Sequence, residues 1–326
     1  MNVRISFLLI CWLVIPIVNS SFFQNIYFKV SQSLKLNENR QNFILPGLFH
    51  EFDVSSKLID IAYCISSLSK IKLPFNCPNE CINFPNTTLI YQFTGDNILR
   101  ELSVTGYIAI DDSEKLVYLS LRGTRSFNDA LTDIKSDQIP YNHCSNCKIH
   151  KGFYETFQNT ISKIDIYLIE ILKNYANTHS FLIMGHSMGG SISVLLASHL
   201  INEFNFKKFK CITMGQPILG NEFLASYFEK IFKLNDISLN NRLMYRITNK
   251  GDYIPRLPIS SNGMIYEQTS GEIFISNMDL TTLQNKDVLV CNGRDDLTCS
   301  KALYGNYIDS HLIYFKRLGN CGYTLY

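Results

Sequence analysis

A serine flanked by glycines stands where one apolar segment gives way to another. The run Gly185-His186-Ser187-Met188-Gly189 follows the strand-like stretch 180–184 and opens the helix-like stretch 187–204. A strand that turns directly into a helix puts the residue at the turn in a strained backbone, and glycines on both sides avoid clashes with it. This geometry lifts the serine hydroxyl above the sheet edge. The pattern therefore predicts a nucleophile at Ser187.

A serine nucleophile needs a base, and two histidines follow it in the chain. His199 is 12 residues further along the predicted helix, about 18 Å away at about 1.5 Å per residue, which is out of reach. The chain order serine, acid, histidine is typical of nucleophiles in strand–turn–helix junctions, and it selects His311 as the base. The upstream histidines His186 and His150 remain as alternatives.

The base in turn needs a carboxylate that orients it. Asp252 follows the strand-like stretch 243–248, in a loop stiffened by Pro255 and Pro258. A carboxylate after the carboxyl end of a strand faces the same sheet edge as the serine. Asp252 is the predicted acid, and Asp309, two residues before the histidine, is the alternative. The other aspartates in this interval are Asp236, Asp279, Asp287, Asp295 and Asp296.

The tetrahedral intermediate of acyl transfer carries an oxyanion, which needs preorganised donors. Met188 offers its backbone N–H at the start of the predicted helix. A second donor is expected after an earlier strand, where stretch 116–121 leads into Arg122-Gly123-Thr124. Glycine allows close approach there, and Thr124 offers both a backbone N–H and a hydroxyl.

The elements that carry these residues alternate along the chain. Apolar residues recur at helical spacing in 53–69, 153–175, 187–204 and 221–232, and strand-like runs occupy 105–110, 116–121, 180–184, 209–214 and 243–248. Alternation of strands and helices predicts an α/β fold with a mostly parallel central sheet flanked by helices.

The composition and the N-terminal segment limit the classes to which the protein can belong. With 30 Lys and Arg against 28 Asp and Glu, the net charge of +2 gives no electrostatic footprint for nucleic acid. An apolar run over 5–18, shorter than a membrane span, ends in small residues and predicts a signal peptide over 1–20. We expect an N-terminal arm or pro-segment over 21–50, one domain over 51–326, no transmembrane segment, and a secreted monomer.

Nine cysteines remain after the leader, so full pairing leaves one free. Three pairs close short loops, and the remaining pair ties the first helix to the C-terminus. The buried-strand cysteine Cys211 is the predicted free thiol, and the predicted disulfides are Cys77–Cys81, Cys144–Cys147, Cys291–Cys299 and Cys64–Cys321. A zinc site is the competing interpretation of Cys144 and Cys147, beside His143, but no second cluster supplies four ligands. Asn86-Thr87-Thr88 is a glycosylation sequon, meaningful in a secreted chain.

Several stretches together resemble the fungal class 3 lipase family of α/β-hydrolases, particularly its disulfide-bearing secreted branch. They are residues 121–124, 150–153, 185–190, 215–217 with 220–221, 245–248 leading to 252–258, and 311–315. The resemblance implies Ser187, Asp252 and His311 as the catalytic triad, with Thr124 and Met188 as oxyanion donors. The chain departs from the family at Met188, where leucine is usual, and at Ser310, where an acidic residue is common.

The same resemblance implies a helical lid after the oxyanion turn. Phe127, Leu131 and Ile134 fall on one helical face there, which suits a cover that opens at an oil–water interface. The implied function is a secreted triacylglycerol lipase acting on lipid or ester substrates without a cofactor or metal. A phospholipase A1 and a feruloyl or other soluble esterase are the alternatives, and a catalytically inactive protein that binds lipid or a partner is a different class.

Overall fold

One large sheet carries the fold in the computed structural model, which describes residues 43–95, 103–123, 137–236, 238–260, 263–302 and 308–322. Within these residues the strand order is β1-β2-β3-β6-β7-β8-β9-β10. The bounds are β1 Thr87–Phe93, β2 Thr105–Asp111, β3 Leu116–Arg122, β6 Ser180–His186, β7 Phe209–Met214, β8 Met244–Asn249, β9 Glu272–Ile275 and β10 Val288–Val290.

The strands from β3 through β6, β7 and β8 to β9 are parallel, whereas β1, β2 and β10 pair antiparallel with their neighbours. Parallel neighbours need long crossovers. The helices α4 (Lys151–Tyr175), α5 (Met188–Phe204) and α6 (Glu222–Ile231) lie in the crossovers from β3 to β8, and the crossover from β8 to β9 is a long loop with one 3-10 turn among its described residues. The carboxyl ends of the parallel strands therefore meet at one edge of the sheet, where ligands bind in open α/β sheets.

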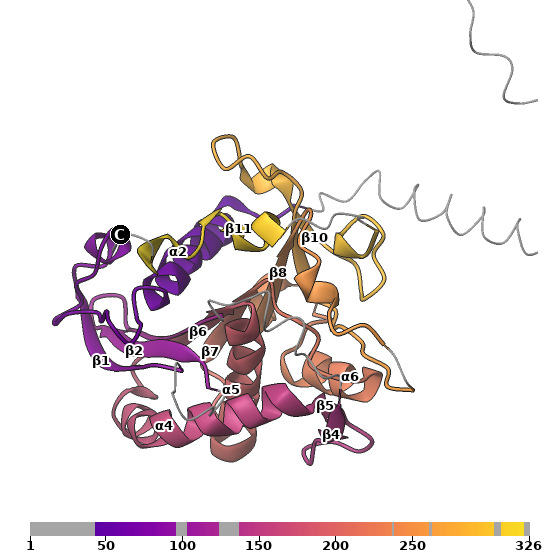
Figure 1. The fold of residues 1–326 in the computed structure, drawn as a ribbon, viewed down its shortest axis with the longest axis horizontal. Coiled ribbons are helices and arrows are strands. Elements are labelled where there is room, and N and C mark those ends of the chain that lie inside the picture. Colours follow the sequence, from indigo (N-terminus) through magenta and orange to yellow (C-terminus); the bar gives the residue numbers. More distant parts are fainter. Residues whose placement is uncertain are drawn as a thin grey trace, which may run out of the picture. The chain divides into compact units, whose positions relative to one another are not determined.

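Helices cover both faces of the sheet. Figure 1 shows α2 (Pro46–Ala62) on one face and α4 and α5 on the other. The apolar strand β6 divides its side chains between the two sides: Leu182 and Met184 join the core with α2, while Phe181 and Ile183 join the core with α4 and α5. Burial on both faces explains why this strand reads as an unbroken apolar run.

The first helix begins earlier than the sequence pattern predicted. It spans Pro46–Ala62 rather than 53–69, and Leu68 is 91% exposed. Proline is favoured in the first helical turn because its missing N–H has no acceptor there. Ile44 and Leu48, which lie within the predicted arm over 21–50, are buried in the core.

Four disulfides join the predicted cysteine pairs, the three short-loop pairs and the remaining long-range one: Cys77–Cys81, Cys144–Cys147, Cys291–Cys299 and Cys64–Cys321. Cys211 is a free, fully buried thiol on β7. The Cys64–Cys321 bridge ties the chain just after α2 to the C-terminal segment, which itself carries His311.

Two short antiparallel pairs lie outside the large sheet, β4 (Gln138–Pro140) with β5 (Lys148–His150) and β11 (Ile313–Tyr314) with β12 (Lys316–Arg317). Short 3-10 helices complete the described secondary structure, at Glu80–Asn83, Leu239–Asn241, Ile254–Arg256, Asn285–Asp287, Ser300–Ala302, Ile308–Leu312 and Asn320–Gly322. No helix among the described residues is long and apolar enough to cross a membrane. The predicted leader 1–20, the segment 21–42, Thr124 and the lid residues Phe127, Leu131 and Ile134 lie outside the described residues.

Candidate active site

Ser187 occupies the sharp turn between β6 and α5 with a backbone φ of 56°, a region that residues other than glycine rarely adopt. The flanking glycines make this turn possible. A Cβ on Gly185 would lie 2.3 Å from the carbonyl oxygen of Gly189, and a Cβ on Gly189 would lie 2.5 Å from the carbonyl oxygen of Leu121. The strained serine predicted from the sequence is therefore present, and its side chain sits above the carboxyl end of β6.

The end of β3 comes directly against the serine. A Cβ on Gly123 would lie 2.8 Å from the Cβ of Ser187, so only glycine fits there. Met188 is the first residue of α5, and first-turn N–H groups have no acceptor within their own helix. The Met188 N–H and Gly123 thus flank the serine, and Thr124 lies outside the described residues.

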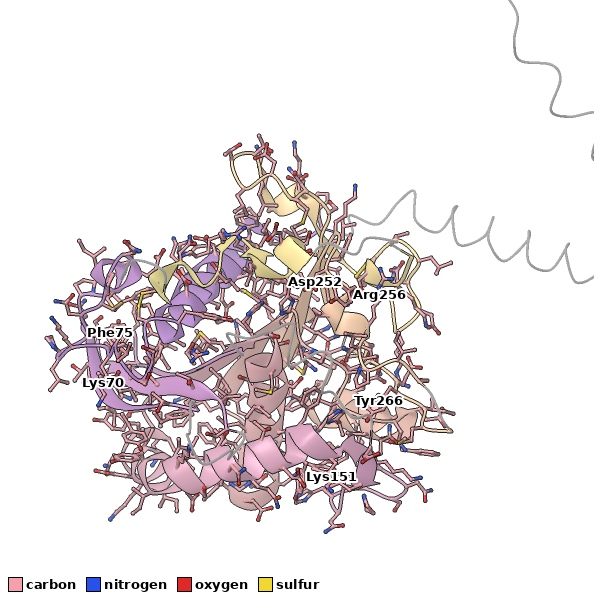
Figure 2. All side chains as sticks on the ribbon, in the orientation of Figure 1. Lys70, Phe75, Lys151, Asp252, Arg256 and Tyr266 are labelled. Carbon is pink, nitrogen blue, oxygen red and sulfur yellow. A yellow bond between two sulfur atoms is a disulfide. The ribbon has the colours of Figure 1, made fainter. Side chains whose placement is uncertain are left out.

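Asp252 and His311 are brought together from positions 59 residues apart. His311 Nδ1 and Asp252 Oδ2 are 2.8 Å apart, and both side chains are almost fully buried. Asp252 follows the carboxyl end of β8 and lies beside the C-terminal segment, as Figure 2 shows. The aspartate thus accepts a hydrogen bond from the imidazole and fixes its tautomer, with the proton on Nδ1.

The histidine ring reaches the nucleophile's side of the sheet. The Ser187 N–H donates to the Met214 carbonyl at 2.9 Å, and the next residue is Gly215. A Cβ on Gly215 would lie 2.8 Å from His311 Cε1, so the ring packs directly on that glycine. Ser187, His311 and Asp252 therefore gather over the carboxyl ends of β6, β7 and β8.

Two further donors hold the aspartate. The Tyr314 hydroxyl donates to Asp252 Oδ2, and the Ile254 N–H donates to Oδ1 at 2.9 Å. Burial alone would raise the pKa of Asp252, but the His311 ring and these hydrogen bonds outweigh burial and hold the pKa below its ordinary value. Asp252 therefore stays a carboxylate in the neutral pH range.

Asn249, the last residue of β8, clamps the backbone around the histidine. Its Nδ2 donates to the carbonyl of Ser310 at 2.7 Å and to that of Ile313 at 2.8 Å. These bonds hold both sides of His311 even though Ser310 replaces the acidic residue common in the family. Asn249 was not among the residues predicted from the sequence.

His186 lies against His311 but is not positioned as a base. Its Nε2 is 2.7 Å from the His311 carbonyl oxygen, which only accepts, so Nε2 carries the proton and Nδ1 accepts from the Tyr63 hydroxyl at 2.6 Å. Complete burial, with the nearby His311 ring, lowers the pKa of His186 to about 3. Tyr63 also accepts from the Gly123 N–H at 3.2 Å, so one hydroxyl links the end of β3 to the histidine segment.

The other candidates lie elsewhere. His150 caps α4 by accepting from the Phe153 N–H at 3.2 Å, and His199 is far along α5. Asp309 is exposed and 3.7 Å from Arg317. Asp252 is therefore the carboxylate that contacts His311, rather than the alternative acid Asp309. Neither His150 nor His199 lies where a base for Ser187 would have to be.

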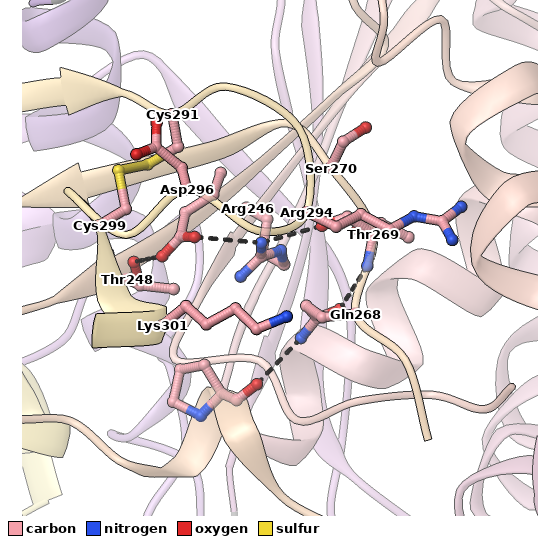
Figure 3. A network of polar contacts seen from close by, with 12 residues as sticks. Arg246, Thr248, Gln268, Thr269, Ser270, Cys291, Arg294, Asp296, Cys299 and Lys301 are labelled. Atoms are coloured by element: carbon pink, nitrogen blue, oxygen red, sulfur yellow. Dashed lines mark hydrogen bonds and ion pairs between the residues drawn. A yellow bond between two sulfur atoms is a disulfide. The ribbon is translucent and has the colours of Figure 1, made fainter. Parts of the chain in front are cut away.

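A buried polar network supports the loop that carries Asp252 (Figure 3). Glu272 accepts from Thr248 Oγ1 at 2.5 Å and pairs with Arg246 at 3.5 Å. Gln268 Nε2 donates to the Pro255 carbonyl at 3.2 Å, three residues after Asp252. These contacts fix β8, β9 and the acid loop to one another.

One group of potential metal ligands is close enough to share an ion within the described ranges, namely Cys64, Cys77 and Cys321. All three sulfurs are in disulfides, which leaves no thiolate to bind a metal. Cys144 and Cys147 are likewise joined, so the competing zinc interpretation of that pair is wrong.

Sequence reasoning missed the tyrosines. Tyr314 lies in the 311–315 stretch already singled out, three residues after the histidine, and that spacing is the signal that could have found it. Tyr63 sits in a helix-like segment and carries no local signal, because its partners are His186 and Gly123.

Comparison with known proteins agrees with this geometry. The model of the family Lipase (class 3) matches residues 118–262. Secreted mono- and diacylglycerol lipase 2 of Gibberella zeae is 31% identical over 276 residues, which cover 75% of this chain and 66% of that protein. The chain thus spans slightly less than two thirds of that relative's length. Lipase A of Sodiomyces alcalophilus is 27% identical over 78% of this chain and 68% of that protein.

The crystal structure of the Lip2 lipase from Yarrowia lipolytica superposes with a TM-score of 0.77 at 31% identity, covering 86% of this chain and 97% of that one. Lipase II from Rhizopus niveus gives 0.71 at 26% identity over 86% and 98% of the two chains. Four relatives are named secreted mono- and diacylglycerol lipases, and the protein is extracellular. With its parallel sheet and strained serine, the chain belongs to the class 3 lipase family of α/β-hydrolases.

Proposed function

We propose that the protein is a secreted carboxylic ester hydrolase that acts on acylglycerols as a triacylglycerol lipase, with Ser187, His311 and Asp252 as its catalytic triad. The observation that carries the proposal is the buried hydrogen bond of 2.8 Å between Asp252 and His311, over the same sheet edge as the strained Ser187. The membership in the lipase family supports the choice of a lipid ester as substrate.

In the first half of the reaction, Ser187 Oγ attacks the acyl carbonyl and His311 Nε2 takes its proton. Nε2 is available for that proton because Asp252 holds the other proton on Nδ1. The imidazolium that forms is stabilised by the Asp252 carboxylate, whose lowered pKa keeps it charged. The charge pair is buried, so its attraction is little screened by water.

The oxyanion of the tetrahedral intermediate is bound by the Met188 N–H at the start of α5 and by Thr124. The helix N-terminus adds a favourable dipole at this position. Collapse of the intermediate breaks the ester C–O bond, and His311 returns its proton to the alcohol. Water then attacks the acyl-enzyme with His311 as base, the bond between the acyl carbon and Ser187 Oγ breaks, His311 returns the proton to Oγ, and the fatty acid leaves. These steps use protein groups and water.

Relatives named mono- and diacylglycerol lipases favour partial glycerides as the second candidate substrate. The test measures fatty acid release from emulsified long-chain tri-, di- and monoglycerides, phospholipid and a soluble short-chain ester, with Ser187→Ala as control. The proposal predicts triglyceride turnover that Ser187→Ala abolishes. Turnover of partial glycerides alone, of phospholipid alone or of the soluble ester alone would each replace the triglyceride proposal with the corresponding alternative.

A further inference from the structure

A cleft of about 830 Å³ opens on the edge of the sheet opposite the triad. Its floor includes Leu116, Ser180 and Phe209, which begin the parallel strands β3, β6 and β7. Ser187 follows the other end of β6, about 20 Å away at about 3.3 Å per strand residue. The cleft is therefore separate from the ester-hydrolysing site.

Asn86 lines this cleft and is the acceptor residue of a sequon. The sequence Asn86-Thr87-Thr88 is the only Asn-x-Ser/Thr pattern after residue 21. The Asn86 side chain is exposed, and its Nδ2 donates to Ser113 Oγ, which also lines the cleft, at 3.2 Å. The atom that would carry a glycan thus already faces a cleft residue.

The lining suits a sugar chain. Phe84, Tyr118 and Phe209 form largely buried apolar walls, while Glu114, Lys207, Lys208, His50 and Asn83 are exposed polar groups. Sugars present apolar C–H faces and a rim of hydroxyls that both donate and accept hydrogen bonds. A cleft of a few hundred Å³ with apolar walls and a small number of polar groups is the usual form of a binding site for such molecules.

We propose that Asn86 carries an N-linked glycan whose first sugars fold back into this cleft. In the secretory pathway Asn86 Nδ2 attacks C1 of a lipid diphosphate-linked oligosaccharide. The Nδ2–C1 bond forms, the C1–O bond to the diphosphate breaks, the diphosphate leaves with the lipid, and one amide proton passes to a base. The second amide hydrogen of Asn86 remains to donate to Ser113.

Because the glycan is covalently attached, weak contacts between its sugars and the cleft are enough for the cleft to be occupied. A tethered ligand meets its site at an effective concentration in the mM range, so the cleft needs only modest affinity for sugar. Occupancy of the cleft stabilises the folded state, because the cleft does not exist in the unfolded chain. The glycan therefore acts on stability and on the accessibility of the cleft rim, and it leaves ester hydrolysis unchanged.

The experiment compares the protein secreted from a yeast host before and after an endoglycosidase trims the glycan to one N-acetylglucosamine. Mass spectrometry is expected to find Asn86 occupied. Acetylation of Lys207 and Lys208 is expected to be several-fold slower before trimming. The exposed Lys151 is the control, because it begins α4 and so lies at the opposite end of that helix from the Asn177 carbonyl that Lys208 contacts, and it is expected to react equally in both forms. Trimming is expected to lower Tm by about 2 °C or more.

Two variants distinguish attachment of the glycan to Asn86 from binding of its sugars in the cleft. Thr88→Ala removes the acceptor sequence but keeps the contact between Asn86 and Ser113, so its lysines react like those of the trimmed enzyme. Thr88→Ser keeps the acceptor sequence and the slow acetylation. An unoccupied Asn86, or an occupied one with equal lysine reactivity before and after trimming, would overturn the proposal. Soluble ester turnover in the same samples tests the proposed function separately.

Discussion

The ring of His186 donates a hydrogen bond from Nε2 to the backbone carbonyl of His311, with 2.7 Å between the two atoms. The residue before the nucleophile thus fixes the backbone of the base, and Tyr63 fixes His186 in turn. Three segments far apart in the sequence, just after α2, at the end of β6 and near the C-terminus, are joined through the His186 imidazole. The Cys64–Cys321 disulfide ties two of these segments covalently.

Tyr63→Phe tests this linkage. The variant loses the donor to His186 Nδ1 and the acceptor for the Gly123 N–H, so we expect kcat on a soluble ester to fall about tenfold with KM little changed. Tyr107→Phe is the matched control, because it also removes a buried tyrosine hydroxyl, which donates to the Leu58 carbonyl away from the triad. We expect both variants to lower Tm, and only Tyr63→Phe to lower kcat. Equal kcat in the two variants would show that Tyr63 serves the fold alone.

The glycines at the nucleophile turn are expected to be irreplaceable. Gly185→Ala puts a Cβ 2.3 Å from the Gly189 carbonyl oxygen, and overpacking of this kind costs roughly 1–3 kcal/mol or more. We expect a strongly lowered Tm or no folded protein. Gly47→Ala in α2 meets no atom within 4 Å and should keep or slightly raise Tm. A wild-type Tm for Gly185→Ala would contradict the geometry of the turn.

Acid should destabilise the protein through its buried histidines. Burial lowers the pKa of His150 to about 4 and that of His186 to about 3, below the ordinary value of 6.5. Below pH 6.5 these histidines become protonated in the unfolded chain but stay neutral in the folded chain. The free energy of unfolding therefore falls as the pH drops from 6.5 toward 4. Asp252, with its lowered pKa, adds a loss of stability only at lower pH, as its carboxylate becomes protonated.

The variant His150→Asn measures how much of the loss of stability in acid is due to His150. Asparagine keeps an acceptor for the Phe153 N–H at the start of α4 but does not titrate. Urea unfolding at pH 7.5, 6.5, 5.5 and 4.5 should give the variant a shallower loss of stability, by roughly 1 kcal/mol per pH unit in the acid range. Parallel curves for variant and wild type would exclude His150 as a source of the acid sensitivity.

The thiols can be counted chemically. Burial raises the pKa of the Cys211 thiol, so it should resist alkylation in the folded protein and react once denaturant exposes it. Mass spectrometry of unreduced, alkylated protein should find one labelled cysteine, Cys211, and only in denaturant. A label on Cys64 or Cys321 would contradict the bridge between α2 and the C-terminal segment.

The sequence predicted the central elements well because their signals are local. The strand β6, the turn at Ser187 and the helix α5 follow from an apolar run, two glycines and helical spacing. The strand β9 and the edge strand β10 were not predicted, since both are short and defined by pairing with strands distant in the sequence. The start of α2 was misplaced because Leu68 continues a helical pattern after the chain has left the helix.

The residues of the site likewise fall into those that local sequence predicted and those that it did not. Chain order and strand context were enough to choose Ser187, Asp252 and His311 as candidates. Asn249 and Tyr63 act through contacts with residues more than 60 positions away, which no spacing reveals. The interfacial activation expected from Phe127, Leu131 and Ile134 stays a prediction.

The central claim is that Asp252 orients His311 for attack by Ser187. The most direct measurement is kcat on a soluble ester for Asp252→Asn beside Asp309→Asn, with folding checked by Tm. The account predicts a loss on the order of 10⁴ for Asp252→Asn, because the amide favours the wrong imidazole tautomer, and near wild-type turnover for Asp309→Asn. Near wild-type turnover for Asp252→Asn with an inactive Asp309→Asn would contradict it.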